Sequence, residues 1–215
     1  MSKALKLFTE TFNRSVNMFT LAQHWHKGHP DDKGFPQNKP VYEDMGRSGI
    51  VFAVAAMDAY FTRRFTEVLL PYLRAKGASS DLVTLLQDAG LDTRAALDLI
   101  QMERPLRRIR ALVDGHLERY TTQRFAAIDS LFLGFGLKDL CANAQKRSTR
   151  KTLLRSVELL VERRHSIVHA ADHNKHGNVV ILDFVEFTKR IQCLSLFITH
   201  ADSIITAFES KLKPK

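Results

Sequence analysis

The sequence has few of the features on which secreted and membrane proteins depend. It contains only two cysteines in 215 residues, and Cys141 and Cys193 lie in apolar helical contexts without CxxC spacing. This usage favours reduced, buried thiols over a disulfide or metal framework. The apolar runs are too short to span a bilayer, and residues 1–19 mix charges with apolar residues instead of forming a signal-peptide core. We therefore expect a cytoplasmic protein with no membrane partner.

Strand patterns and nucleotide-binding loops are also missing. There is no fixed-period repeat and no phosphate-binding glycine loop, and residues 179–182 are the only strand candidate, too short to found a sheet. A hydrophobic fraction of 45% in 215 residues is enough for one substantial core. The sequence therefore predicts a single all-α domain over residues 1–215, a helical bundle with a long C-terminal helix.

Apolar residues recur at steps of three and four along most of the chain, which predicts amphipathic helices. Ser80 and Asp92 are expected to cap two short helices, and Asp183 with Glu186 resembles a capping box for the last one. The expected long helices cover residues 5–19, 48–72, 105–132, 148–171 and 184–212.

Residues 24–46 interrupt this pattern. Glycine and proline recur through the segment, which predicts an irregular loop. Histidines and aspartates in it suggest a metal site, but their spacings match no known ligand pattern; they are His24, His26, His29, Asp31 and Asp32. We expect no metal there.

The net charge of +9 favours a polyanionic partner such as nucleic acid. Basic residues cluster along the chain, although solvated helix faces would explain each cluster equally well. The residues taken as candidates for binding RNA are Arg63, Arg64, Arg155 and Arg163.

Two charged residues stand at positions where the pattern predicts a core. The stripe of residues 153, 157, 160, 167 and 168 is completed by Arg164, and a buried guanidinium must meet a carboxylate, a phosphate or water. The alternative is a long side chain that reaches the surface. Asp58 is the single carboxylate in the apolar run 50–61 and needs a cationic or donor partner. Pairing Asp58 with Arg164 or Arg163 would satisfy both requirements.

Two histidines follow Arg164 on the same helix. His165 and His169 are four residues apart and share one face. A second copy of this helix, related by a two-fold axis, would close that open face into a cleft suited to RNA cleavage, with imidazoles for proton transfer and arginine for the phosphate. A zinc site is the competing interpretation, because His173 extends the ladder. Positions eight apart lie about 12 Å apart along a helix, so the ladder cannot give one ion three ligands.

The segment Arg164-His165-Ser166-Ile167-Val168-His169 resembles the RxxxxH motif of the HEPN superfamily, and the wider string 162–172 resembles its RiboL-PSP-HEPN type. By helix order the resemblance covers about residues 48–208, and Asp58 resembles the acidic position of the family. His165 departs from the commoner asparagine or aspartate, and the loop at 24–46 matches nothing in the family pattern.

This resemblance implies a homodimeric, metal-independent endoribonuclease without a cofactor, often a toxin or an antiviral-defence component. Arg164 would stabilise the phosphate, His169 would be the general acid or base, His165 would assist, and Asp58 would support the site. The products would be a 2′,3′-cyclic phosphate and a 5′-hydroxyl. An antitoxin or regulatory protein is a further expected partner. The alternative is a HEPN-like dimer that binds RNA or a partner protein without cutting.

Overall fold

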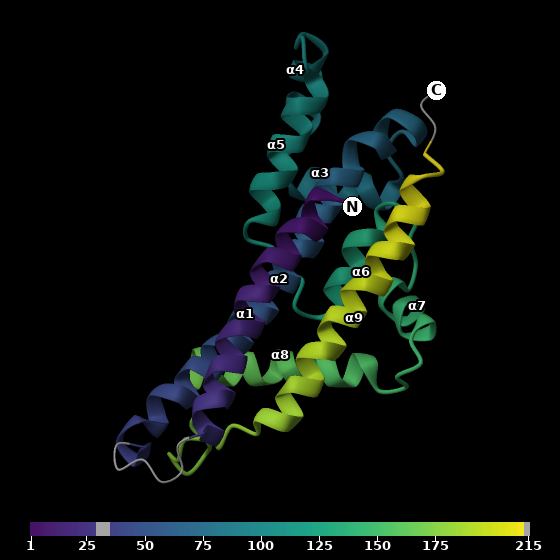
Figure 1. Cartoon of the computed structure of the whole chain (residues 1–215). Helices are drawn as coiled ribbons and strands as arrows, with labels where there is room; N and C mark the ends of the chain where they lie inside the picture. Colours follow the sequence, from purple (N-terminus) through teal and green to yellow (C-terminus); the bar gives the residue numbers. More distant parts are fainter. Residues whose placement is uncertain (29–34, 213–215) are drawn as a thin grey trace. The chain divides into compact units, whose positions relative to one another are not determined.

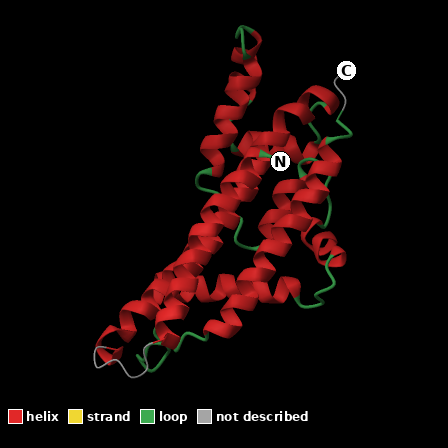
Figure 2. Ribbon diagram, viewed as in Figure 1, coloured by secondary structure: helices red, strands yellow, loops and turns green. Residues whose placement is uncertain are grey.

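The structure is a computed structural model that describes residues 1–28 and 35–212. Figure 1 shows the order of the helices, and Figure 2 shows that the described residues form helices and loops with no strand. An isolated antiparallel bridge joins His173 to Val179 at the predicted strand candidate. The predicted all-α class is therefore confirmed. The helices are α1 Lys3–Gly28, α2 Phe35–Lys76, α3 Ser80–Asp88, α4 Thr93–Ile100, α5 Pro105–Leu117, α6 Phe125–Leu133, α7 Leu140–Arg147, α8 Leu153–Ala170 and α9 Phe184–Glu209.

The chain divides into two compact units. Unit 1 comprises Met1–Leu5, Asp58–Arg147 and the chain from His200 onward. Unit 2 comprises Lys6–Met57 and Ser148–Thr199. The helices α1, α2 and α9 contribute residues to both units. The expectation of a single domain stays a prediction.

The predicted loop at 24–46 is mostly helical, because α1 continues to Gly28 and α2 begins at Phe35. Gly46, and Gly49 just after the segment, permit close packing inside unit 2 rather than a turn. A Cβ on Gly46 would lie 2.6 Å from Leu182 Cδ2, and one on Gly49 would lie 3.1 Å from the Ser15 carbonyl oxygen. The Ser15 hydroxyl also donates to the Gly49 carbonyl over 2.6 Å, which holds α1 against α2.

The predicted helix over 105–132 is also wrong, because α5 ends at Leu117 and α6 starts at Phe125. Inside unit 1 the intervening segment is held by hydrogen bonds from Thr122 to Asp58 of α2. Thr122 is fully buried, and its backbone N–H and its hydroxyl both donate to that carboxylate. A side-chain acceptor far away in the sequence thus replaces the helical acceptor.

The N-terminus of α9 follows the sequence prediction closely. The Glu186 N–H donates to Asp183 Oδ1 over 2.9 Å, which confirms the predicted cap. The apolar stripe of this helix is buried from Phe184 through Ile205.

Contrary to the sequence expectation, α9 is long and apolar enough to cross a bilayer by length and composition alone. A core helix passes the same test, and the buried stripe of α9 is what a core helix needs.

Candidate functional site

The RxxxxH motif occupies the last turns of α8 in unit 2. The helix ends at Ala170, and the next two residues adopt left-handed conformations, with φ of +45° at Ala171 and +61° at Asp172. The Asp172 N–H donates back to the Ser166 carbonyl over 3.1 Å, which caps the helix inside the motif. A left-handed residue other than glycine costs about 1–2 kcal/mol, so the surrounding structure must hold this turn.

The side chain of Asp172 supplies that restraint. Its carboxylate is completely buried, and Oδ2 accepts hydrogen bonds from Arg47 Nε over 2.7 Å and from Arg163 Nη2 over 2.6 Å. Both arginines also donate to the Val180 carbonyl, over 2.9 Å and 3.0 Å. The Val180 N–H in turn donates to the Asp172 carbonyl over 2.9 Å. We call Arg47, Arg163 and Asp172 the arginine–aspartate clamp, because they tie α2, α8 and the segment before α9 together inside unit 2.

The two arginines of the clamp respond differently to burial. Burial lowers the pKa of Arg163, the charge of Asp172 offsets part of this effect, and the positive charge of Arg47 lowers it further. For Arg47, burial also acts to lower the pKa, but hydrogen bonds to Asp172, Asp44 and Glu43 outweigh it and raise the pKa overall. Both guanidinium groups stay charged, since arginine does not deprotonate in proteins. The carboxylate partner of Arg163 is Asp172 and not the predicted Asp58, so Arg163 is committed to the fold of unit 2.

Arg164 has a different environment from its neighbour. Both side chains are half-buried and both Nε atoms lack an acceptor among the described residues, but Arg163 pairs with Asp172 whereas Arg164 has no carboxylate partner there. The apolar stripe predicted for this helix is correct in its first turns, where Leu153, Val157 and Leu160 are buried. It fails at Val168, which is 48% exposed. A half-buried arginine without an internal carboxylate partner keeps its positive charge for an anionic ligand such as phosphate.

His165 and His169 are both exposed, and their ring centroids lie 4.3 Å apart with an angle of 38° between the rings. The imidazoles therefore form one pair on the outer face of α8, as the spacing predicts. His173, the next rung, lies beyond the end of the helix, with Nδ1 3.1 Å from the Ala170 carbonyl. No group of three or more histidine, cysteine or acidic side chains within residues 1–28 and 35–212 is arranged to hold a metal. His29, Asp31 and Asp32 lie outside the described residues.

Asp58 has neutral donors as partners. Its Oδ1 accepts from the Thr122 N–H over 2.6 Å and from the Thr122 hydroxyl over 2.7 Å. Its Oδ2 accepts from Gln123 Nε2 over 3.0 Å. The sequence predicted an ion pair of Asp58 with Arg164 or Arg163, but among the described residues these neutral donors satisfy its carboxylate instead. Asp58 thereby fixes the segment between α5 and α6 to α2 within unit 1.

The remaining candidates for RNA binding fall into different environments. Arg64 is 1% exposed and pairs with Glu67, Asp202 and Glu209, so its predicted role in RNA binding is wrong. A helical pattern alone does not separate a buried arginine surrounded by acids from an exposed one. Arg155 is exposed and pairs with Glu158 over 2.7 Å. Arg63 is exposed.

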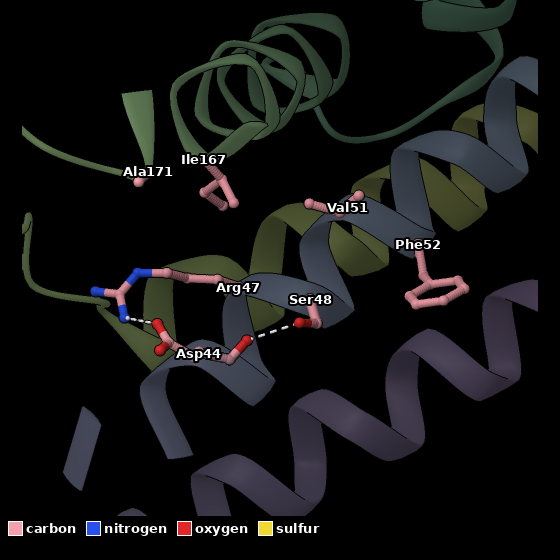
Figure 3. A pocket seen from close by; sticks show the side chains of 7 residues that line it. All are labelled: Asp44, Arg47, Ser48, Val51, Phe52, Ile167 and Ala171. Atoms are coloured by element: carbon pink, nitrogen blue, oxygen red, sulfur yellow. Dashed lines mark hydrogen bonds and ion pairs between the residues drawn. The ribbon is translucent and has the colours of Figure 1, made fainter. Parts of the chain in front are cut away.

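A pocket of about 320 Å³ lies in unit 2 beside the end of α8. Figure 3 shows Ile167 and Ala171 on one side of it and Arg47, Ser48, Val51 and Phe52 of α2 on the other, with Asp44 bound to Arg47. His165 and His169 are not among its lining residues. The two histidines thus stand on an exposed helix face outside this pocket, which the motif segment contacts through Ile167.

Sequence analysis overlooked Arg47 and gave Asp172 no role. Arg47 fell in the segment interpreted as a loop, and Asp172 was only the last residue of the string that resembles the family. The available signal for the clamp was Asp172, a carboxylate three residues after the last histidine of the motif.

The all-α fold, with an arginine and a histidine five positions apart at the end of a long helix that precedes the last helix, defines a protein of the HEPN type. The sequence profile of the RiboL-PSP-HEPN family matches residues 13–207, and the chain belongs to this family. The match begins at residue 13, whereas the resemblance inferred from helix order began at about residue 48. Neither the curated proteins nor the solved structures gave a match. HEPN domains are often ribonucleases, so membership indicates RNA cleavage or a nucleotide-related function in general.

Proposed function

We propose that this protein is a metal-independent endoribonuclease that acts as a homodimer. The observation that carries the proposal is the composition of the last turns of α8. There the half-buried Arg164 has no carboxylate partner among the described residues, and the following turn presents the exposed imidazole pair of His165 and His169. The clamp at Asp172 supports it, because the structure fixes the end of α8 on which these side chains stand.

The chemistry of these groups suits attack by the 2′-hydroxyl of RNA. One imidazole accepts the proton of that hydroxyl while its oxygen forms a bond to phosphorus, and the bond from phosphorus to the 5′-oxygen breaks. The leaving oxygen takes a proton from an acid, and the product is a 2′,3′-cyclic phosphate with a 5′-hydroxyl. We assign one of these two proton transfers to His169, as general base or general acid, and His165 assists. Arg164 stabilises the negative charge that develops on the phosphate oxygens.

A chelation assay tests the proposal directly. Total RNA is incubated with the pure protein in excess EDTA, and the fragments are compared with those produced by His169→Ala. We expect cleavage by the wild-type protein to persist, because imidazole and guanidinium supply the whole mechanism. DNA should survive, since it lacks the attacking 2′-hydroxyl. Loss of cleavage on chelation with recovery on adding zinc or manganese would contradict the mechanism, and RNA that is bound but never cut would favour a binding module.

The exposure of the motif supports a dimer. His165, Val168 and His169 are all exposed, and one copy of α8 leaves them on an open face. We expect light scattering at micromolar concentration to give the mass of a dimer, and Val168→Glu to shift the mass toward the monomer and reduce cleavage. Leu21→Glu is the matched control, because Leu21 is a similarly exposed apolar residue of α1, at 47%. A wild-type monomer with full activity would contradict the shared site.

In the cell we propose that the protein acts on cytoplasmic RNA as a toxin or an antiviral-defence effector, restrained by an antitoxin or regulatory protein. Growth arrest on expression of the wild-type chain, absent for His169→Ala, is the expected sign of such an activity.

A further inference from the structure

A groove lined by arginines lies within unit 1, apart from the residues assigned to catalysis. It has a volume of about 720 Å³ and lies between the end of α2 and the beginning of α5. We call it the arginine groove, after Arg74 of α2 and Arg104, Arg107 and Arg110 at the start of α5. Leu70, Pro105, Leu106 and Ala111 supply most of its apolar lining.

Most of the positive charge in this groove is not neutralised internally. The four arginines are exposed, and only Arg110 has an ion pair within the described part of the chain, with Asp114 over 3.5 Å. Glu103 is the only other acidic residue of the lining. Four positive charges therefore face two negative ones. Exposed guanidinium groups without internal carboxylate partners keep their hydrogen-bond donors for an anionic ligand.

The N-terminus of α5 adds to this positive potential. No side chain caps the helix at Arg104, and Pro105 occupies its first turn. The positive end of the helix dipole therefore has no side-chain cap and no acidic residue in the first turn to offset it. Arg104, Arg107 and Arg110 follow one another at steps of three and lie along one face over about 9 Å. Successive phosphates of one strand are spaced by about 3.4 Å along a duplex, so such a row spans more than one phosphate.

From these observations we propose that the arginine groove binds the phosphate backbone of the RNA substrate. This inference rests on the proposed function for its choice of RNA as the ligand. Guanidinium groups match phosphate through paired donors, and a row of cations along a helix matches the regular charges of a nucleic-acid backbone. The lining offers no aromatic side chain for base stacking. The groove should therefore hold the strand without selecting its sequence.

The test measures binding separately from cleavage. A 5′-fluorescent single-stranded RNA is titrated with the His169→Ala protein, which leaves the strand uncut, and anisotropy is recorded at several salt concentrations. We expect Arg104→Ala with Arg107→Ala to weaken binding by at least about tenfold at low salt. Each lost phosphate contact should reduce the slope of log affinity against log salt by about 0.7.

Arg108→Ala with Arg119→Ala is the matched control. Both arginines are exposed, Arg108 lies in α5 and Arg119 just after it, and neither lines the groove. The control removes the same charge, so a specific groove predicts little change for it. Equal losses in the two double variants would show a diffuse effect of net charge and overturn the proposal. Competition by polyglutamate as effective as competition by unlabelled RNA would also overturn it, in favour of an acidic protein ligand.

The groove and the proposed function fail in different ways. If the groove double variant, Arg104→Ala with Arg107→Ala, binds RNA like the parent protein while His169→Ala abolishes cleavage, the groove proposal is wrong and the ribonuclease stands. If the groove double variant loses affinity and its slope of log affinity against log salt falls, although the wild-type chain never cuts RNA, the groove is supported and the catalytic assignment is wrong. The midpoints of thermal unfolding of the groove double variant and of its control should match that of the parent, because the substituted side chains are exposed.

Discussion

Arg164→Ala and His169→Ala should each lower the rate of RNA cleavage by about 10² to 10⁴-fold, the contribution expected of a positioned acid or base or of a phosphate-stabilising group. His169 is exposed, and Arg164 Nε has no acceptor among the described residues, so neither truncation breaks a recorded hydrogen bond of the fold. The measurement is the initial rate on a defined single-stranded RNA, with the free energy of unfolding determined in parallel.

Two further variants make this prediction specific. Arg164→Lys keeps the charge but loses the planar pair of donors, so its rate should stay far below that of the wild type. His176→Ala is the histidine control, since His176 is exposed and follows the motif without belonging to it. Full activity in Arg164→Ala or His169→Ala would remove the ribonuclease assignment. A comparable loss in His176→Ala would show that the assay responds to structure and not to the motif.

The sequence was most informative where one helix face contacts a continuous core. The stripe of α9 and its cap at Asp183 were predicted closely, because local spacing and one side-chain hydrogen bond determine both. Glycines misled the prediction in the segment 24–46. Gly46, which the sequence placed in a loop, lies in α2, where the absence of a side chain lets the helix approach Leu182 and Phe184 in unit 2.

The candidate site shows the same division between local and distant determinants. Spacing alone placed His165 and His169 on one face and directed attention to Arg164. It did not distinguish the roles of Arg163 and Arg164, because that difference depends on Asp172, which turns back toward Arg163 after the helix end, and on Arg47, 125 residues earlier in the chain. Asp58 likewise required a partner, but only the structure shows that Thr122 and Gln123 supply it.

Asp172→Ala should lower the free energy of unfolding by about 3–5 kcal/mol, because it leaves two largely buried guanidinium groups without their shared carboxylate. The side chain of Asp172 is 0% exposed, and those of Arg47 and Arg163 are 6% and 14% exposed. Urea denaturation followed by circular dichroism measures the change. Asp44→Ala is the matched control, since Asp44 pairs with the same Arg47 over 3.0 Å but is 72% exposed.

An exposed pair is worth about 1 kcal/mol or less, so the contrast between the two aspartates isolates the effect of burial. Asp172→Asn keeps an acceptor oxygen but loses the charge, and we expect a loss of stability between the other two. Cleavage by Asp172→Asn, measured where the protein is still folded, should also fall, because the left-handed turn at Ala171 and Asp172 then loses part of the restraint that ends α8 after His169. A destabilisation by Asp172→Ala no larger than that by Asp44→Ala would mean that the clamp does not hold the end of α8. His169, the proposed general acid or base, lies only three residues before Asp172. Full stability with full activity in Asp172→Asn would therefore mean that the clamp does not position His169.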